Sequence, residues 1–174
     1  TEDGYAAHEA LGDAPMSAHI GIHLVSRCLA LNELGGLEEA EAIGQLGYVR
    51  QILDETLEYT KGRQAFGQAV GAFQHNKFLL AELFTRVEVT QAYVDQCILR
   101  LNAGELDAAG AAQAKYWCTD LQKRVVDRCL QLFGGYGYMT EYPIARAYAD
   151  ARVTSIYGGT NEVMKTIIAK AIGL

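Results

Sequence analysis

Apolar residues recur every three or four positions through most of the chain, which is the spacing of one face of an α-helix. Between residues 37 and 61, for example, Leu46, Val49, Leu53 and Leu57 fall on a common face. Similar stripes predict further helices over residues 16–31, 69–101 and 106–133, and shorter ones over residues 143–150 and 161–172. No stretch requires a strand, and no internal repeat interrupts the pattern.

Glycine-containing breaks separate the predicted helices. Gly35-Gly36 parts the first two, Gly62 and Gly67 bracket a turn, and Gly104 suits a left-handed helix cap. The glycine-rich run at 134–138 ends the helix before it. Long antiparallel helices joined by short turns predict an all-α, up-and-down helical bundle.

The composition is that of a globular domain, since half of the 174 residues are hydrophobic and 21% are charged. The net charge of −6 argues against a nucleic-acid-binding protein, because such proteins usually present a basic surface. No apolar run is long enough for a membrane span. The start at Thr1 lacks an initiator Met and a basic secretion signal, so we expect a processed or excised piece.

Cysteine and histidine spacing predicts neither a disulfide framework nor a metal site. The four cysteines stand far apart, so we expect buried free thiols in a reducing interior, either the cytoplasm or the mitochondrial matrix. No histidine follows a glutamate at the spacing of a di-iron bundle. His19 and His23 are spaced to share a helix face, but no further zinc ligand lies near them, and ordinary helix histidines are the simpler interpretation.

Three segments carry the residue types of an anion or phosphate site. Residues 158–161 precede a predicted helix, whose free amides could hold an anion and whose cap would be Thr160 or Asn161. Arg63 could grip a phosphate or belong to a solvated basic turn. The glycines of the run at 134–138 could admit a ligand close to the backbone or simply stop a helix. The residue types alone leave each of these alternatives open.

Four motifs occur in a specific order along the chain. They are KGRQAFG at 61–67 with Phe73-Gln74 after it, QLFGGYGY at 131–138 with EYP after it, DAR at 150–152, and IYGGTNE at 156–162. In this order they resemble the C-terminal domain of the acyl-CoA dehydrogenase family, most like its long-chain type. The resemblance covers residues 44–174. Residues 1–43 match poorly and are interpreted as a leader and an extra helix.

The resemblance implies a helical bundle that builds half of an FAD site and the interface of a homo-oligomer, either a dimer or a tetramer. By motif position, Thr160 and Glu162 would contact the FAD of the same subunit. The residues that would reach the FAD of a neighbouring subunit are Arg63, Phe66 and Gln74, and, toward the adenosine or pyrophosphate, Gln131, Gly134 and Gly135.

The family reaction is the α,β-dehydrogenation of an acyl-CoA thioester. A carboxylate removes the α-proton, the β-hydrogen leaves as hydride to the flavin, and the electrons usually pass to an electron-transfer flavoprotein. Many members carry the catalytic glutamate where this chain has Gly158, which cannot act as a base. Long-chain and isovaleryl-type members use a glutamate at the position of Leu37. Glu38 is one residue away and is the candidate base, with an ordinary surface glutamate as the alternative.

The N-terminal helical domain and the middle β-domain of that family have no counterpart in residues 1–43. We therefore expect a fragment of a dehydrogenase, a truncated product or a subunit that needs a partner. A second hypothesis is a non-catalytic interaction module that oligomerises through an exposed apolar face and binds no flavin.

Overall fold

Five α-helices make up most of the part of the chain that the structure describes. The computed structural model describes residues 36–174, with side chains from residue 44 onward. The predicted helix at 16–31, with His19 and His23, lies outside the described residues, as does the side chain of Glu38. The elements are α3 (Gly36–Gly62), β1 (Gln64–Ala65), β2 (Gln68–Ala69), the 3-10 helix η1 (Val70–Ala72), α4 (Gln74–Asn102), α5 (Ala108–Phe133), the 3-10 helix η2 (Gly134–Tyr138), α6 (Pro143–Val153) and α7 (Asn161–Ala171).

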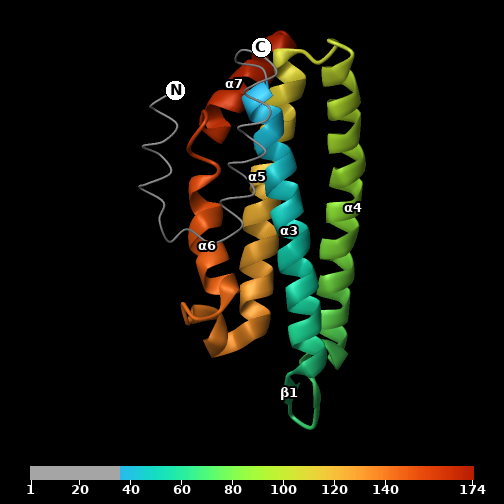
Figure 1. The fold of residues 1–174 in the computed structure, drawn as a ribbon, viewed down its shortest axis with the longest axis vertical. Helices are drawn as coiled ribbons and strands as arrows, with labels where there is room; N and C mark the ends of the chain where they lie inside the picture. Colours follow the sequence, from blue (N-terminus) through green and yellow to red (C-terminus); the bar gives the residue numbers. More distant parts are fainter. Residues whose placement is uncertain (1–35) are drawn as a thin grey trace.

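Helices α3, α4, α5 and α6 alternate in direction, and α7 continues in the direction of α6 (Figure 1), which confirms the predicted all-α, up-and-down bundle. Helices α3, α4 and α5 run along the long axis of the molecule, and α6 and α7 lie on the side away from α4 (Figure 1). Helix α5 is central, because it packs against α3, α4, α6 and α7. Since α3 and α5 point the same way, their C-terminal ends lie at the same end of the bundle (Figure 1).

The predicted apolar stripes form the core. Leu46, Val49 and Leu53 of α3 are at most 2% exposed, as are Leu83 and Val87 of α4. The buried stripe of α5 includes Ala114, Leu121, Val125 and Cys129. Burial of side chains of this size stabilises the fold by about 1.5–3 kcal/mol each, so the bundle rests on this shared interior.

The chain between α3 and α4 differs from the sequence prediction. A short hairpin, whose two strands have two residues each, stands where a simple turn was predicted. Gln64 pairs with Ala69, and Ala65 pairs with Gln68. Its turn residues, Phe66 and Gly67, have φ angles of 52° and 81°. Such hairpin turns require positive φ at both central positions. Strands this short show no alternating pattern, and the helix predicted from residue 69 begins only at Gln74.

Most predicted helix boundaries agree with the structure to within two residues. Helix α5 ends at Phe133, α7 starts at Asn161, and α4 ends just before Gly104, whose φ is 71°. The hydroxyl of Thr160 caps α7 by accepting a hydrogen bond from the Val163 amide at 3.3 Å. Helix α6 instead runs to Val153, three residues beyond its predicted end, because Ala151 packs into the core.

Within residues 36–174, no helix is long and apolar enough to cross a membrane. The described side chains also contain no group of three or more histidine, cysteine, aspartate and glutamate residues placed to hold a metal ion.

Candidate functional site

A cleft of about 560 Å³ opens at the end of the bundle where α3 and α5 finish. The hairpin after α3 and the 3-10 helix after α5 lie at this same end (Figure 1). Segments 70 residues apart in the sequence are thereby brought together. The cleft is lined by Tyr59, Arg63, Val70, Gln131, Leu132, Phe133, Gly134, Gly135, Tyr136 and Met139.

Aromatic rings form the inner wall of this cleft. The rings of Tyr59 and Phe133 stack with centroids 3.9 Å apart. The Tyr59 hydroxyl also donates a hydrogen bond to the Phe133 carbonyl oxygen at 3.4 Å. Tyr136 stacks on Tyr142 at 5.2 Å, and Tyr142 meets the edge of Phe133. The Tyr59–Phe133 stack joins the ends of α3 and α5, and Tyr136 and Tyr142 extend the aromatic cluster along η2 and the segment after it.

Arg63 supplies the positive charge of the cleft. Its guanidinium carbon lies 5.1 Å from the centroid of the Tyr136 ring, which is a cation–π contact. Within the described part of the chain, no carboxylate lies within ion-pair distance of Arg63. Its N–H donors are therefore available to an external anion. Burial raises the pKa of the neighbouring Tyr59, and the Arg63 charge opposes that rise.

The three glycines between residues 134 and 137 differ in their surroundings, since two face open space and one is closely packed. A Cβ built on Gly134 or Gly135 would meet nothing within 4 Å, so the backbone here faces open space in the cleft. A Cβ on Gly137 would lie 2.6 Å from the Leu130 carbonyl oxygen, so that glycine is required by packing. Gly134 also ends α5, with a φ of 59°. The helix stop and the close approach of a ligand are thus compatible.

The structure therefore brings four of the predicted site residues together in one cleft: Arg63, Gln131, Gly134 and Gly135. Phe66 and Gln74 do not line it. Phe66 stands at the hairpin tip, 96% exposed, with its ring edge-on to Phe73. Gln74 is the exposed first residue of α4.

Thr160 and Glu162 lie elsewhere, at the start of α7 in the upper half of the molecule (Figure 1). Glu162 is exposed, and the pKa of its carboxyl is lowered mainly by a hydrogen bond from its own backbone amide, with help from Thr160. A carboxylate at this place complements the helix dipole. The loop before them contains Gly158 and Gly159, whose φ angles are 62° and 95°.

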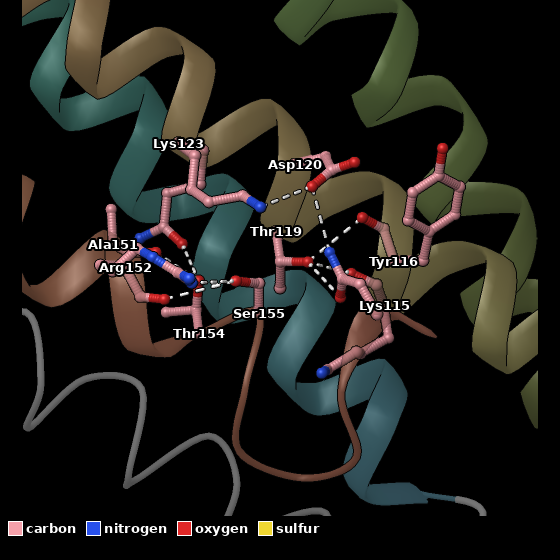
Figure 2. Close-up of polar contacts among 11 residues, drawn as sticks. Lys115, Tyr116, Thr119, Asp120, Lys123, Ala151, Arg152, Thr154 and Ser155 are labelled. Carbon is pink, nitrogen blue, oxygen red and sulfur yellow. Dashed lines mark hydrogen bonds and ion pairs between the residues drawn. The ribbon is translucent and has the colours of Figure 1, made fainter. Parts of the chain in front are cut away.

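A polar network pins this loop to α5 (Figure 2). The Thr119 hydroxyl bonds the Asn161 side-chain oxygen at 3.0 Å, and the Asn161 amide nitrogen donates to Asp120 at 3.1 Å. The Lys115 ammonium donates to the carbonyl oxygens of Tyr157, at 3.0 Å, and of Gly159. Sequence reasoning missed Lys115, Thr119 and Asp120 as parts of a site, although polar side chains on a largely buried helix were a usable signal.

Comparisons with known proteins agree with this geometry. Residues 39–173 match the family model for the acyl-CoA dehydrogenase C-terminal domain. The chain belongs to the acyl-CoA dehydrogenase family. The rat (Rattus norvegicus) mitochondrial long-chain specific acyl-CoA dehydrogenase is 51% identical over 121 residues, which are 70% of this chain and 28% of the rat protein.

Solved structures show the same bundle. An acyl-CoA dehydrogenase from Geobacillus kaustophilus superposes with a TM-score of 0.79 at 42% identity, covering 81% of this chain and 37% of that one. PigA, solved with FAD and proline, gives a TM-score of 0.76 at 26% identity over 81% of this chain and 37% of its own. The chain thus spans well under half the length of the acyl-CoA dehydrogenase relatives it matches.

Proposed function

We propose that the chain supplies the C-terminal, FAD-contacting and oligomer-forming part of an FAD-dependent acyl-CoA dehydrogenase. The observation that carries this proposal is the cleft, in which an arginine without an acidic partner among the described residues faces glycine backbone and aromatic rings. Anionic, planar and hydrogen-bonding surfaces are what the two halves of FAD present.

The residues of the cleft fit the nucleotide side of FAD. The Arg63 guanidinium would hold the pyrophosphate, because its fork of donors matches phosphate oxygens. The open backbone at Gly134 and Gly135 would let the cofactor approach closely, and exposed Gln131 would donate to or accept from it. Phe66 at the hairpin tip and Gln74 at the start of α4 would extend this contact.

Thr160 and Glu162 would contact FAD at a second place. Lys115, beside their loop, precedes Gln131 of the cleft by 16 residues of one helix, which is about 24 Å along the axis. Two contact regions so far apart support the arrangement implied by the resemblance, in which the cleft reaches a neighbour's FAD and the α7 start reaches the subunit's own. FAD binding would then require a homo-oligomer, a dimer or a tetramer.

The proposed reaction is the α,β-dehydrogenation of an acyl-CoA thioester, for which FAD supplies the hydride acceptor. Gly158 occupies the position of the base in many members, so Glu38, at the start of α3, is the proposed base. The remaining domains would come from the rest of a longer protein or from a partner subunit. An electron-transfer flavoprotein would accept the electrons, in a reducing interior such as the cytoplasm or the mitochondrial matrix.

One observation favours the second candidate, a non-catalytic oligomerisation module without flavin. Helix α4 exposes Phe78 and Val89, each at 66%. They are eleven residues apart, so they lie on the same helix face. These two exposed apolar side chains, with the exposed Glu82 and Thr85 between them, suit contact with a second copy whether or not FAD is bound.

Flavin retention separates the two candidates. The purified chain is incubated with FAD and desalted, and the visible flavin band is recorded beside a circular dichroism spectrum. We expect the wild type to retain flavin, Arg63→Ala to weaken binding at least about ten-fold, and the control Arg86→Ala to bind normally. Arg86 is the matched arginine, since it pairs with Glu82 on the surface of α4. A folded wild type without a flavin band would favour the module.

A further inference from the structure

Lys115 is the largest fully buried side chain of the described core. An ammonium group has three donors and no acceptor, and it is costly to bury unless those donors are bonded. Among the described residues, no carboxylate lies within ion-pair distance of it. Its hydrogen bonds go instead to two backbone carbonyls of the loop between α6 and α7. The ammonium group therefore interacts with the backbone of that loop and not with a carboxylate of the described part of the chain.

The two carbonyls lie on either side of Gly158, because they belong to Tyr157 and Gly159. A single nitrogen that binds both fixes the orientation of two peptide planes in a segment of consecutive positive φ angles. Glycine segments of this kind have many accessible conformations when no contact selects one. Lys115 thus selects one conformation of residues 157–159.

The ends of the loop are held by other residues of the same α5 face. The Thr119 hydroxyl bonds the side chain of Asn161, the first residue of α7, and the Gln122 side chain accepts a hydrogen bond from Thr154 at 3.0 Å. Residues 115, 119 and 122 follow helical spacing, so they form one polar row under the loop. The Asn161 backbone amide closes the loop by donating a hydrogen bond to the Ser155 carbonyl at 3.2 Å. Between these two ends, Lys115 binds the carbonyls of Tyr157 and Gly159, while the Tyr157 hydroxyl accepts a hydrogen bond from the Gln45 side chain at 3.1 Å.

We propose that Lys115 is a positioning residue that sets the conformation of the 157–159 segment and, through it, the placement of Thr160 and Glu162 against the flavin. The proposal deepens the proposed function and rests on it for the flavin part. Because Lys115 is fully buried against the loop, it would act on a bound flavin only through the loop.

Hydrogen–deuterium exchange of the 174-residue chain tests the loop part without flavin. In Lys115→Met, which keeps an apolar stem and removes the donors, the amides of 156–161 should exchange at least about ten-fold faster. The amides in the middle of α3 should change much less. Lys115→Arg, which keeps a cationic donor, should restore part of the protection, and Lys77→Met, an exposed lysine on α4, should change nothing. Unchanged loop exchange in a folded Lys115→Met would overturn the proposal.

If Lys115→Met does not fold, the wild type still decides the question. Lysine acylation read by mass spectrometry is run through sub-denaturing urea, beside exchange of the loop amides. Lys115 should become reactive together with the 156–161 amides, before global unfolding. Reactivity that appears only with global unfolding, after the loop has opened, would show that Lys115 does not hold the loop.

The flavin part has its own readout. FAD titrated against each folded variant should bind at least about ten-fold more weakly to Lys115→Met, normally to Lys77→Met and intermediately to Lys115→Arg. A loosened loop with unchanged FAD affinity would refute positioning against the flavin. If the wild-type chain binds no FAD but Lys115→Met still speeds exchange of the loop amides, the result would refute FAD binding by the lone chain. It would support the role of Lys115 in holding the loop.

Discussion

Gly137→Ala should destabilise the protein, whereas Gly135→Ala two residues earlier should not. The Cβ added at Gly137 would lie 2.6 Å from the Leu130 carbonyl oxygen and 3.1 Å from its Cγ. Real Cβ atoms essentially never come within 3.0 Å of another heavy atom, and the oxygen is part of the α5 backbone. Ordinary contact at 3.4 Å requires a shift of about 0.8 Å between η2 and α5. At Gly135 the same atom meets nothing within 4 Å.

Overpacking of this kind costs about 1–3 kcal/mol, so we expect the free energy of unfolding to fall by about 2 kcal/mol in Gly137→Ala. With a urea m-value of about 2 kcal/mol/M, the midpoint of unfolding should drop by about 1 M. Circular dichroism during urea titration measures this, with Gly135→Ala expected within about 0.5 kcal/mol of the wild type. Equal midpoints for the two variants would refute the packing argument and the division of labour among these glycines.

Three further predictions concern stability. Asp107→Ala should lower the free energy of unfolding, measured by urea titration, by about 1 kcal/mol, because the Asp107 carboxylate caps α5 by accepting a hydrogen bond from the Gly110 backbone amide at 2.8 Å. An unchanged free energy would mean that the cap is dispensable. Thr90→Val should cost about 1 kcal/mol and shift the emission of Trp117, whose indole donates to the Thr90 hydroxyl at 2.9 Å; an unaltered spectrum would contradict this contact. Burial raises the pKa of Cys118 from 9.0 and of Tyr93 from 10.0, each to about 12, so the unfolded chain releases these protons first. The resulting stability is fully present below about pH 9 and is lost as pH rises toward 12, and urea midpoints at pH 7, 9 and 10 should fall less steeply in Cys118→Ala.

The helices were predictable because their signal is local. The stripe from Leu46 to Leu53 repeats at helical spacing and is buried as expected. The hairpin at 64–69 was not predictable, since two-residue strands show no alternation and its turn places Phe66, a bulky residue, at positive φ. The start of α4 was predicted too early, because the hairpin and η1 occupy the residues before Gln74. The Val70 backbone amide donates a hydrogen bond to the Arg63 carbonyl at 2.8 Å, so this amide bonds to the hairpin and not within α4.

Motif order singled out Arg63 and Gln131, and the resemblance assigned both to the FAD of one neighbouring subunit. Only the fold shows that they line one cleft. That follows from the direction of α4, which returns the chain so that α3 and α5 end together (Figure 1). Tyr59 and Tyr136 were missed, because a tyrosine near a helix end or in a glycine run does not by itself indicate a contact. Their stacking partners come from distant segments.

The sequence by itself determined the helical periodicity, the glycine breaks between helices and the motif order of the acyl-CoA dehydrogenase family. These depend on neighbours three or four residues apart or on residue identity alone. Only the tertiary structure decided that Arg63 faces glycine backbone across a cleft, and that Lys115 is buried under the α6–α7 loop. A lysine is ordinarily exposed. The burial of Lys115 is tolerated because backbone carbonyls more than 40 residues away accept hydrogen bonds from its ammonium group.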